Sequence, residues 1–322
     1  MKTRLVECSI VVLIVSLLAI RCTDTRHETI TYTANVPIVM SYEDFRTSFA
    51  KNEPVDMVQT GKIYFKDNFL FVNEVNKGIH VIDNSDPSNP QIIAFYEIIG
   101  NVDMAIRGNI LFADSYIDLV AIDITDIVNP IEVGRLENVF PEITCLPEVW
   151  DYPISYPDSV EGIIVAWEVR EITVDYQTHT NSGVWNYKEN GRGGDFMMTD
   201  AANTSGGESA VGVAGSMARF MLNDYHLYAI THPQQITTLS VINHNAIQIV
   251  DSVQTWRTME TLFKYQDYLF VGTTTGMMIF DIKDAAMPTH VSDYDHITAC
   301  DPVVVDGQYA YVTLRSGTRC FN

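Results

Sequence analysis

The chain has 322 residues, 47% hydrophobic and 19% charged, which is enough apolar material for a folded core and excludes a disordered protein. Its net charge of −21 opposes binding to phosphate backbones and anionic lipid headgroups, so nucleic acid is not an expected partner. Frequent Tyr, Phe, Val, Ile and Thr favour β structure, and long amphipathic helical patterns are hard to find.

The first 22 residues are predicted to be an export signal. A basic start, MKTR, precedes the apolar run 11–20, which is short for a membrane span and typical of a secretory signal. Cys22 follows at the distance of a lipoprotein acylation site, although Arg21 stands where such signals carry a small residue. We expect Cys22 to be lipidated, with a short signal anchor and plain secretion as the alternatives.

Residues 23–56 are expected to form a polar tether followed by a short helix. The stretch SYEDFRTSFA, residues 41–50, places Ser41 before Asp44 in the spacing of a capping box. This pattern predicts a helix that begins directly after Ser41.

From residue 57 onward the sequence repeats one unit. Each copy has four short β runs separated by turns rich in Asp, Asn or Gly, and Leu70 and Leu111 hold the same place 41 residues apart. Copies start near residues 62, 102 and 260, and a weaker one covers 217–253. Four-stranded units of about 40 residues are typical of propeller blades. We therefore predict an all-β fold, a β-propeller of about four blades plus an incomplete fifth, spanning 57–322 with an insertion at about 141–215.

Three repeats share an Asp that precedes a Pro by seven residues: Asp83, Asp123 and Asp281. An Asp at this place can accept hydrogen bonds from turn amides, and the Pro is tolerated at the entry to an outer strand. A calcium loop would need more carboxylates than DNSDPSNP supplies. We predict a structural role in the turn.

The strings HVIDNSDPSNP, VAIDITDIVNP and IFDIKDAAMP resemble the LVIVD repeat of bacterial cell-surface proteins. Together with GSMARF and CDPVVVDGQYAYVTLRSG, they are similar to lipoprotein-type members from Bacteroidetes-like bacteria. The resemblance covers roughly residues 35–322. It implies a β-propeller, export and a place at the cell envelope. It does not imply a particular activity.

The fifth repeat, which starts at CDPVVVDGQYAYVTLRSG, stops after two of its four strands. Closed propellers need complete blades, and exposed sheet edges are a liability. We therefore expect the sequence to be a fragment of a longer chain that contains two or three further blades. The alternative is that the N-terminal strand NVPIVM, residues 35–40, completes the last blade.

The insertion holds the first candidate binding residues. Trp150, Tyr152 and Trp185 lie in an aromatic region punctuated by Pro and Gly. Exposed Trp and Tyr side chains can stack on a sugar or anchor a protein partner. The alternative is that these aromatic residues form a small core within the insertion.

A second candidate is a set of acids that open the inner strands of three blades: Asp103, Glu260 and Asp301. A ring of carboxylates beside the central channel could hold a cation or a basic group. The alternative is that each carboxylate accepts hydrogen bonds from backbone amides of the adjacent blade.

Cysteine and histidine patterns add little chemistry. Cys300 and Cys320 bracket a predicted hairpin, so a disulfide in an exported protein is one possibility and two buried thiols the other. The His residues lack metal-ligand spacing, and no nucleophile, phosphate-loop or dinucleotide motif is present, so we expect no metal and no cofactor.

The sequence thus predicts a lipid-anchored propeller at the cell envelope, at the outer membrane or cell surface. We expect it to be a non-enzymatic binding or scaffolding module whose partner is an envelope protein or a glycan. The alternatives are a hydrolase or lyase acting on envelope polysaccharide, and a purely structural surface protein.

Overall fold

A computed structural model describes residues 26–140, 145–147, 149–155, 161–178, 219–295 and 303–312. The chain divides into two units. The smaller unit contains residues 1–37, 147–158 and 167–191, and the larger contains 38–146, 159–166 and 192–322.

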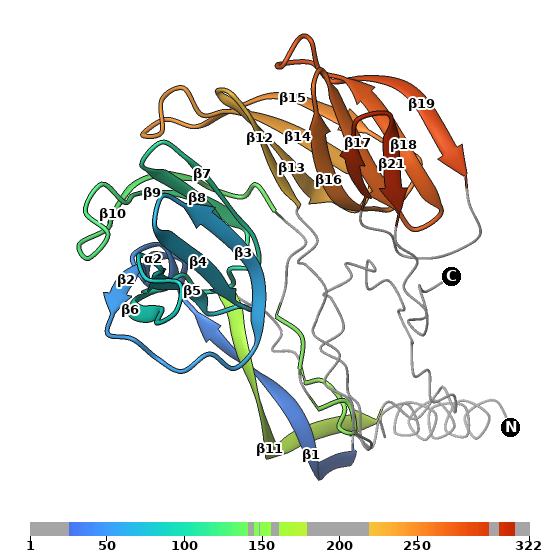
Figure 1. Cartoon of the computed structure of the whole chain (residues 1–322). Helices are drawn as coiled ribbons and strands as arrows, with labels where there is room; N and C mark the ends of the chain where they lie inside the picture. Colours follow the sequence, from blue (N-terminus) through green and yellow to red (C-terminus); the bar gives the residue numbers. More distant parts are fainter. Residues whose placement is uncertain are drawn as a thin grey trace, which may run out of the picture. The chain divides into compact units, whose positions relative to one another are not determined.

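The larger unit consists of consecutive antiparallel β-meanders, which we number blades 1 to 5 (Figure 1). Blade 1 contains β3 (Thr60–Lys66), β4 (Phe69–Glu74), β5 (Gly78–Asp83) and β6 (Gln91–Glu97), with β2 (Ala50–Asn52) beside β6. Blade 2 contains β7 (Met104–Arg107), β8 (Ile110–Ser115), β9 (Asp118–Asp123) and β10 (Ile131–Leu136).

Blade 3 contains β12 (Phe220–Asn223), β13 (His226–His232), β14 (Gln235–Ser240) and β15 (Gln248–Gln254). Blade 4 contains β16 (Met259–Tyr265), β17 (Tyr268–Thr273), β18 (Gly276–Asp281) and β19 (Thr289–Asp295). The described part of blade 5 is the hairpin of β20 (Val303–Asp306) and β21 (Tyr309–Val312). Meanders of four strands at the four predicted full copies, including the weak one in blade 3, confirm the all-β propeller fold.

The first strand of each blade is its inner strand. Inner strands β3, β7, β12, β16 and β20 neighbour one another in that order. Each sheet therefore packs face to face against the next blade. This explains why the strands carry nearly continuous apolar runs rather than an alternating pattern, since blades 2 to 4 have a neighbouring blade on each face.

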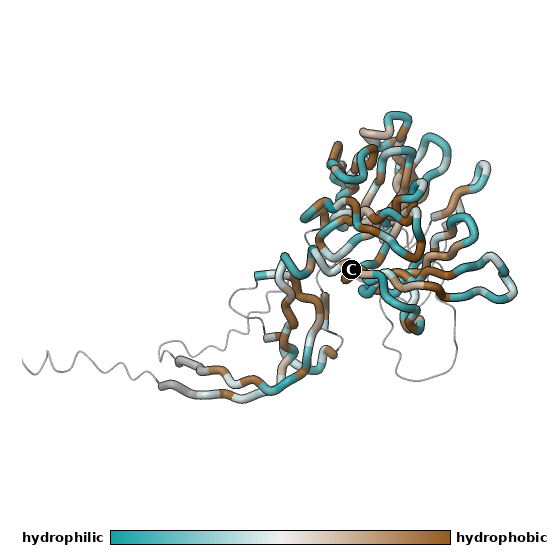
Figure 2. The backbone as a smooth tube through the Cα atoms, turned by 90° about the vertical axis from the view of Figure 1, so that its left-hand side faces the viewer, coloured by the Kyte–Doolittle hydropathy of each residue, from teal (hydrophilic) through white to brown (hydrophobic). Residues whose placement is uncertain are grey.

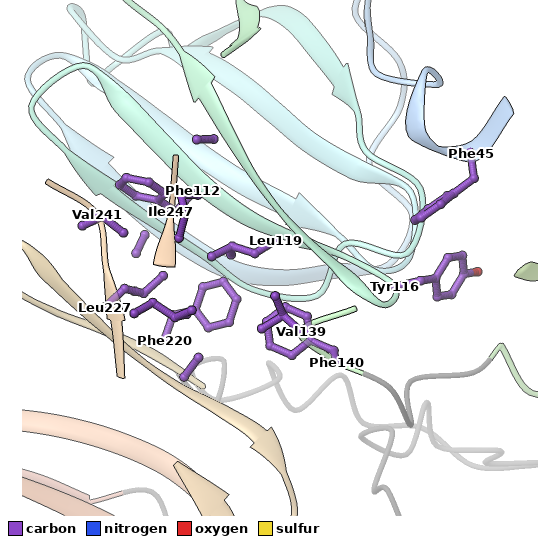
Figure 3. Close-up of a cluster of buried hydrophobic side chains, with 14 of the residues drawn as sticks. Phe45, Phe112, Tyr116, Leu119, Val139, Phe140, Phe220, Leu227, Val241 and Ile247 are labelled. Carbon is purple, nitrogen blue, oxygen red and sulfur yellow. The ribbon is translucent and has the colours of Figure 1, made fainter. Parts of the chain in front are cut away.

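The hydrophobic cores lie between successive blades. Figure 2 shows that the strands carry most of the apolar stretches, whereas the turns are polar. The core between blades 2 and 3 gathers Phe112 and Leu119 from one side and Phe220 and Leu227 from the other (Figure 3). Phe45 joins the same core from outside the blades, with its ring centroid 6.3 Å from that of Tyr116.

Phe45 belongs to the short helix α2 (Tyr42–Arg46). The side chain of Ser41 accepts a hydrogen bond from the amide of Asp44 at 3.1 Å, and Ser41 is the N-cap. The helix predicted from the capping-box pattern is therefore confirmed. A helix this short is stable only because its one buried side chain is anchored in the core.

The smaller unit holds most of a two-stranded sheet formed by β1 (Arg26–Met40) and β11 (Ile163–Thr178). Residues 26–40, expected to include a polar tether, are thus a strand, and within it residues 29–34 alternate Thr with apolar residues at the period of two that a strand requires. β1 pairs with β11 and with no blade among the described strands, so residues 35–40 do not complete the last blade. No helix in the described parts of the chain is long and apolar enough to cross a membrane.

Candidate functional site

Asp103 is used to join three blades. Its side chain is buried immediately before β7, where Oδ2 accepts the backbone amides of Arg219 at 2.5 Å and Phe220 at 2.9 Å in blade 3. Oδ1 accepts the amide of Met104 at 2.6 Å and pairs with Nζ of Lys62, in blade 1, at 2.5 Å. The carboxylate therefore bonds amides of the adjacent blade, as the structural alternative predicted.

A second buried acid, Asp114 on β8, supports this junction. Its Oδ1 accepts the amides of Val102 at 2.8 Å and Asp103 at 2.9 Å, and the side-chain amide of Asn101 at 2.9 Å. Burial raises the pKa of Asp114 to about 6, although the positive charge of Arg219 and the two amides act in the opposite direction. Asp114 is a buried titratable group that sequence reasoning missed.

Asn101 extends the network back to blade 1. Asn73 on β4 donates from its side chain to the backbone oxygen of Asn101 at 3.1 Å and to its side-chain oxygen at 2.7 Å. Asn73 stands 41 positions before Asp114, so the same place in the repeat faces the same seam in both blades. A polar residue at one repeat position of an otherwise apolar strand was the signal that could have revealed this network.

The inner strands begin with charges that alternate in sign: Lys62, Asp103, Arg219 and Glu260 in blades 1 to 4. Burial lowers the pKa of Arg219, whereas the charges of Asp114 and Asp103 act in the opposite direction. Glu260 is buried on β16, next to the inner strand of blade 5. Asp301 lies outside the described residues. The charges of Lys62, Asp103 and Arg219 therefore compensate one another where blades 1, 2 and 3 meet, which is a structural role.

The turn aspartates act as predicted. Each one accepts the backbone amide two residues on: Ser85 to Asp83 at 2.9 Å, Thr125 to Asp123 at 2.8 Å and Lys283 to Asp281 at 2.9 Å. Hydrogen bonds from these same neighbours hold the pKa of all three carboxyl groups below its usual value. Ser240 takes this place in blade 3, which is one reason why that copy is weak in sequence.

The aromatic segment 149–155 lies in the smaller unit and presents its rings to solvent. Trp150 is 64% exposed and Tyr152 is 40% exposed. The backbone behind them is held by Asn35 of β1, whose buried side chain donates to the carbonyl oxygens of Val149 at 2.7 Å and Tyr152 at 3.0 Å. The backbone of Asn35 makes two further hydrogen bonds with the segment. Asn35 is a positioning residue that the sequence pattern did not reveal.

Several predicted residues lie outside the described part of the chain: Trp185, Cys22, Cys300 and Cys320. Among the described residues, no group of three or more His, Cys, Asp or Glu side chains could hold a metal ion. A shallow depression lined in part by Ser48, Glu132 and Arg135 is too small to hold a water molecule.

Blade 1 contains a further buried pair that sequence reasoning missed. Glu74 accepts the amides of Gln59 at 2.7 Å and Val58 at 3.1 Å, and contacts Nε2 of the fully buried His80 at 3.1 Å. Burial raises the pKa of Glu74, but these hydrogen bonds outweigh it and the net shift is downward. The pair fixes residues 58 and 59, which lead into β3, so its role is structural.

Comparison with known proteins agrees with this architecture. The LVIVD repeat family matches residues 59–97 and 264–296, which lie in blades 1 and 4, so the chain carries LVIVD repeats. No curated protein matches the chain.

Three solved structures illustrate the fold likeness. The computationally designed protein Ika8 is 10% identical with a TM-score of 0.43, over 83% of this chain and 59% of that one. The dihydro-heme d1 dehydrogenase NirN is 10% identical with a TM-score of 0.37, over 79% and 51%. The β-propeller domain of Swd1 from Myceliophteria thermophila is 10% identical with a TM-score of 0.35, over 81% and 82%. The chain thus spans between half and three fifths of the first two structures, and these likenesses concern the fold alone.

Proposed function

We propose that this LVIVD-repeat β-propeller is an exported, lipid-anchored module of the cell envelope that binds or scaffolds a partner without catalysing a reaction. The observation that carries the proposal is the exposure of Trp150 and Tyr152 on a segment fixed by Asn35. The signal-like start, Cys22 and the LVIVD repeats support export and anchoring.

Exposed aromatic rings on a fixed backbone suit recognition. Trp and Tyr have few rotatable bonds, so they lose little conformational entropy on binding, and their faces stack on sugars or fill pockets of protein partners. The net charge of −21 disfavours strongly anionic partners. The partner class we propose is therefore a neutral envelope glycan or an envelope protein.

Replacement of Trp150 and Tyr152 by Ala tests the binding role. The probes are a panel of neutral soluble polysaccharides and a pull-down from solubilised native envelope. Each substitution should weaken capture about tenfold or more, as expected for an aromatic hot spot. The matched control is Trp256→Ala, because Trp256 is 57% exposed but lies between β15 and β16. Unchanged capture by the Trp150 and Tyr152 variants, or equal loss with the control, would overturn the proposal.

The anchor is tested separately. Cys22→Ser should move the protein from the membrane fraction to the soluble fraction of native cells and abolish incorporation of a labelled fatty acid. Cys145→Ser is the control and should change neither result. Retention of both label and membrane association by the Cys22→Ser variant would refute the lipid anchor.

A hydrolase or lyase acting on envelope polysaccharide is the alternative. Such an enzyme needs two carboxylates that face one substrate-sized pocket. Asp103 instead bonds three backbone amides and one lysine. No described observation favours the enzyme, so we do not adopt it.

A further inference from the structure

One edge of strand β11 is paired with no described strand. β11 is 16 residues long, and β1 is its sole partner among the described strands. A two-stranded sheet is marginally stable alone, and each of its strands has an edge whose backbone groups are open to pairing. The far edge of β1 is occupied near its middle, where the backbone of Asn35 bonds residues 153 and 155.

The direction of the two strands follows from two contacts. Gly162 lies against the carbonyl of Met40, whereas the hydroxyl of Thr173 hydrogen-bonds that of Thr31 at 2.9 Å. Later residues of β11 therefore meet earlier residues of β1, so the pair is antiparallel. The next strand that β11 could accept, at the edge that no described strand occupies, is one of matching length and complementary side chains.

The middle of β11 is complementary to itself. It reads Glu168, Val169, Arg170, and Nε of Arg170 lies 2.8 Å from Oε1 of Glu168 with both side chains about half exposed. Val169 between them is 43% exposed. If β11 pairs antiparallel with β11 of a second copy about a two-fold axis at Val169, each Glu168 lies directly opposite an Arg170 of the other copy.

The charges select this register. An axis at Glu168 would place Glu168 opposite itself, and an axis at Arg170 would place Arg170 opposite itself, and like charges directly opposite each other are destabilising. An axis between two neighbouring residues is excluded, because it would place side chains of one sheet face opposite side chains of the other face. Only the axis at Val169 gives two attractive pairs, and the symmetry supplies both at once.

We propose that this protein forms a symmetric dimer in which the two β11 strands pair edge to edge about Val169. The two ribbons then become one four-stranded antiparallel sheet with the order β1, β11, β11, β1. This arrangement fills the edge of β11 that no described strand occupies, and it provides the further strands that a two-stranded ribbon lacks. The proposal does not depend on the ligand or on the lipid anchor.

A charge swap on the whole purified chain tests the proposal. Light scattering coupled to size exclusion should give a dimer for the native sequence. Glu168→Arg or Arg170→Glu alone creates two repulsive pairs and should raise the dissociation constant about tenfold or more. The double variant Glu168→Arg, Arg170→Glu should restore the dimer. The matched control Glu53→Arg, in an exposed position with 90% side-chain exposure, should stay dimeric. A monomeric native protein, or a double variant no better than the single ones, overturns the proposal.

Cysteine cross-linking supplies a second measurement that needs no weakened variant. Val169→Cys places two thiols directly opposite each other, within reach of a disulfide under mild oxidation. Val174→Cys is the matched control, since Val174 is 44% exposed on the same strand but five residues from the axis. A dimer band on a non-reducing gel for Val169→Cys, absent for Val174→Cys and for the native sequence, supports the register. Equal bands for both variants, or none for Val169→Cys, refute it.

Discussion

Replacement of Asp103 by Ala should loosen the seams that join blades 1, 2 and 3. The carboxylate is the acceptor for the amides of Arg219 and Phe220 in the next blade and the counter-charge of Lys62 in the previous one. An alanine leaves these two amides and the ammonium group without that partner. Asn is not a matched replacement, because its amide nitrogen would meet backbone donors that need an acceptor.

The size of the stability loss depends on which polar groups stay buried after the substitution. Each buried donor left without its acceptor costs about 1–3 kcal/mol, so the amides of Arg219 and Phe220 together account for about 2–6 kcal/mol. Lys62 is 11% exposed in its side chain, and Phe220 is 2% exposed. We therefore expect Asp103→Ala to lower the free energy of unfolding by about 3–5 kcal/mol. Lys62→Met should cost only about 1–2 kcal/mol, because Asp103 then keeps its three amide donors.

The assay is urea unfolding combined with amide hydrogen exchange. Because a repeat protein need not unfold in one step, exchange in residues 104–107 and 219–223 shows whether the loss is local to the seam. Asp103→Ala should lower the urea midpoint and remove protection from both peptides, while residues 268–281 of blade 4 keep theirs. A cost below about 1 kcal/mol for Asp103→Ala, or an equal cost for Lys62→Met, would contradict this role of the carboxylate.

Three further predictions concern other buried groups. The pKa of Asp114 is about 6 in the folded protein against about 3.9 unfolded, so its stabilising contribution is present below pH 4 and lost as pH rises through 6. Asp114→Asn should remove about 3 kcal/mol of this decline in the free energy of unfolding, measured by urea unfolding from pH 4 to 7.5. A constant difference between the two proteins over this pH range would contradict the prediction. Gly78→Ala should lower the free energy of unfolding by about 2 kcal/mol or more, because φ is 147° and the new Cβ would lie 2.0 Å from the carbonyl oxygen of Tyr96. An unchanged thermal unfolding curve would disprove the clash. Asn35→Ala should lower the free energy of local unfolding of residues 149–155 by about 1–3 kcal/mol and speed proteolytic cleavage within them. Unchanged cleavage would show that Asn35 does not hold the segment.

The turn chemistry shows why much of the fold was predictable. Asp83 and its counterparts bond amides two residues away, so the interaction is local and every copy repeats it. Ser41 and Asp44 likewise act within one turn of helix. Local patterns of this kind are present in the sequence itself, because the residues that interact are neighbours along the chain.

The buried polar network could be predicted only in part. The sequence suggested that Asp103 bonds the adjacent blade, but it did not show that the donors are Arg219 and Phe220, which lie more than a hundred residues later. The role of Asp114 could not be predicted from the sequence, because an acid in a strand has no local signature when its partners come from another segment. The exposure of Trp150 and the hold of Asn35 on its segment were equally undecided, since both depend on long-range contacts.

The sequence by itself determined the repeat, the strand count of each blade, the turn type and the expectation of a propeller. These features depend on local periodicity and on the need of each four-stranded sheet to cover both faces. Only the tertiary structure decided that β1 pairs with β11 rather than with a blade, that Asp103 is consumed in a three-blade junction, and that the aromatic segment faces solvent. The physical reason is that each depends on which distant segments meet, and hydrogen-bond partners across a seam are chosen by packing, not by spacing along the chain.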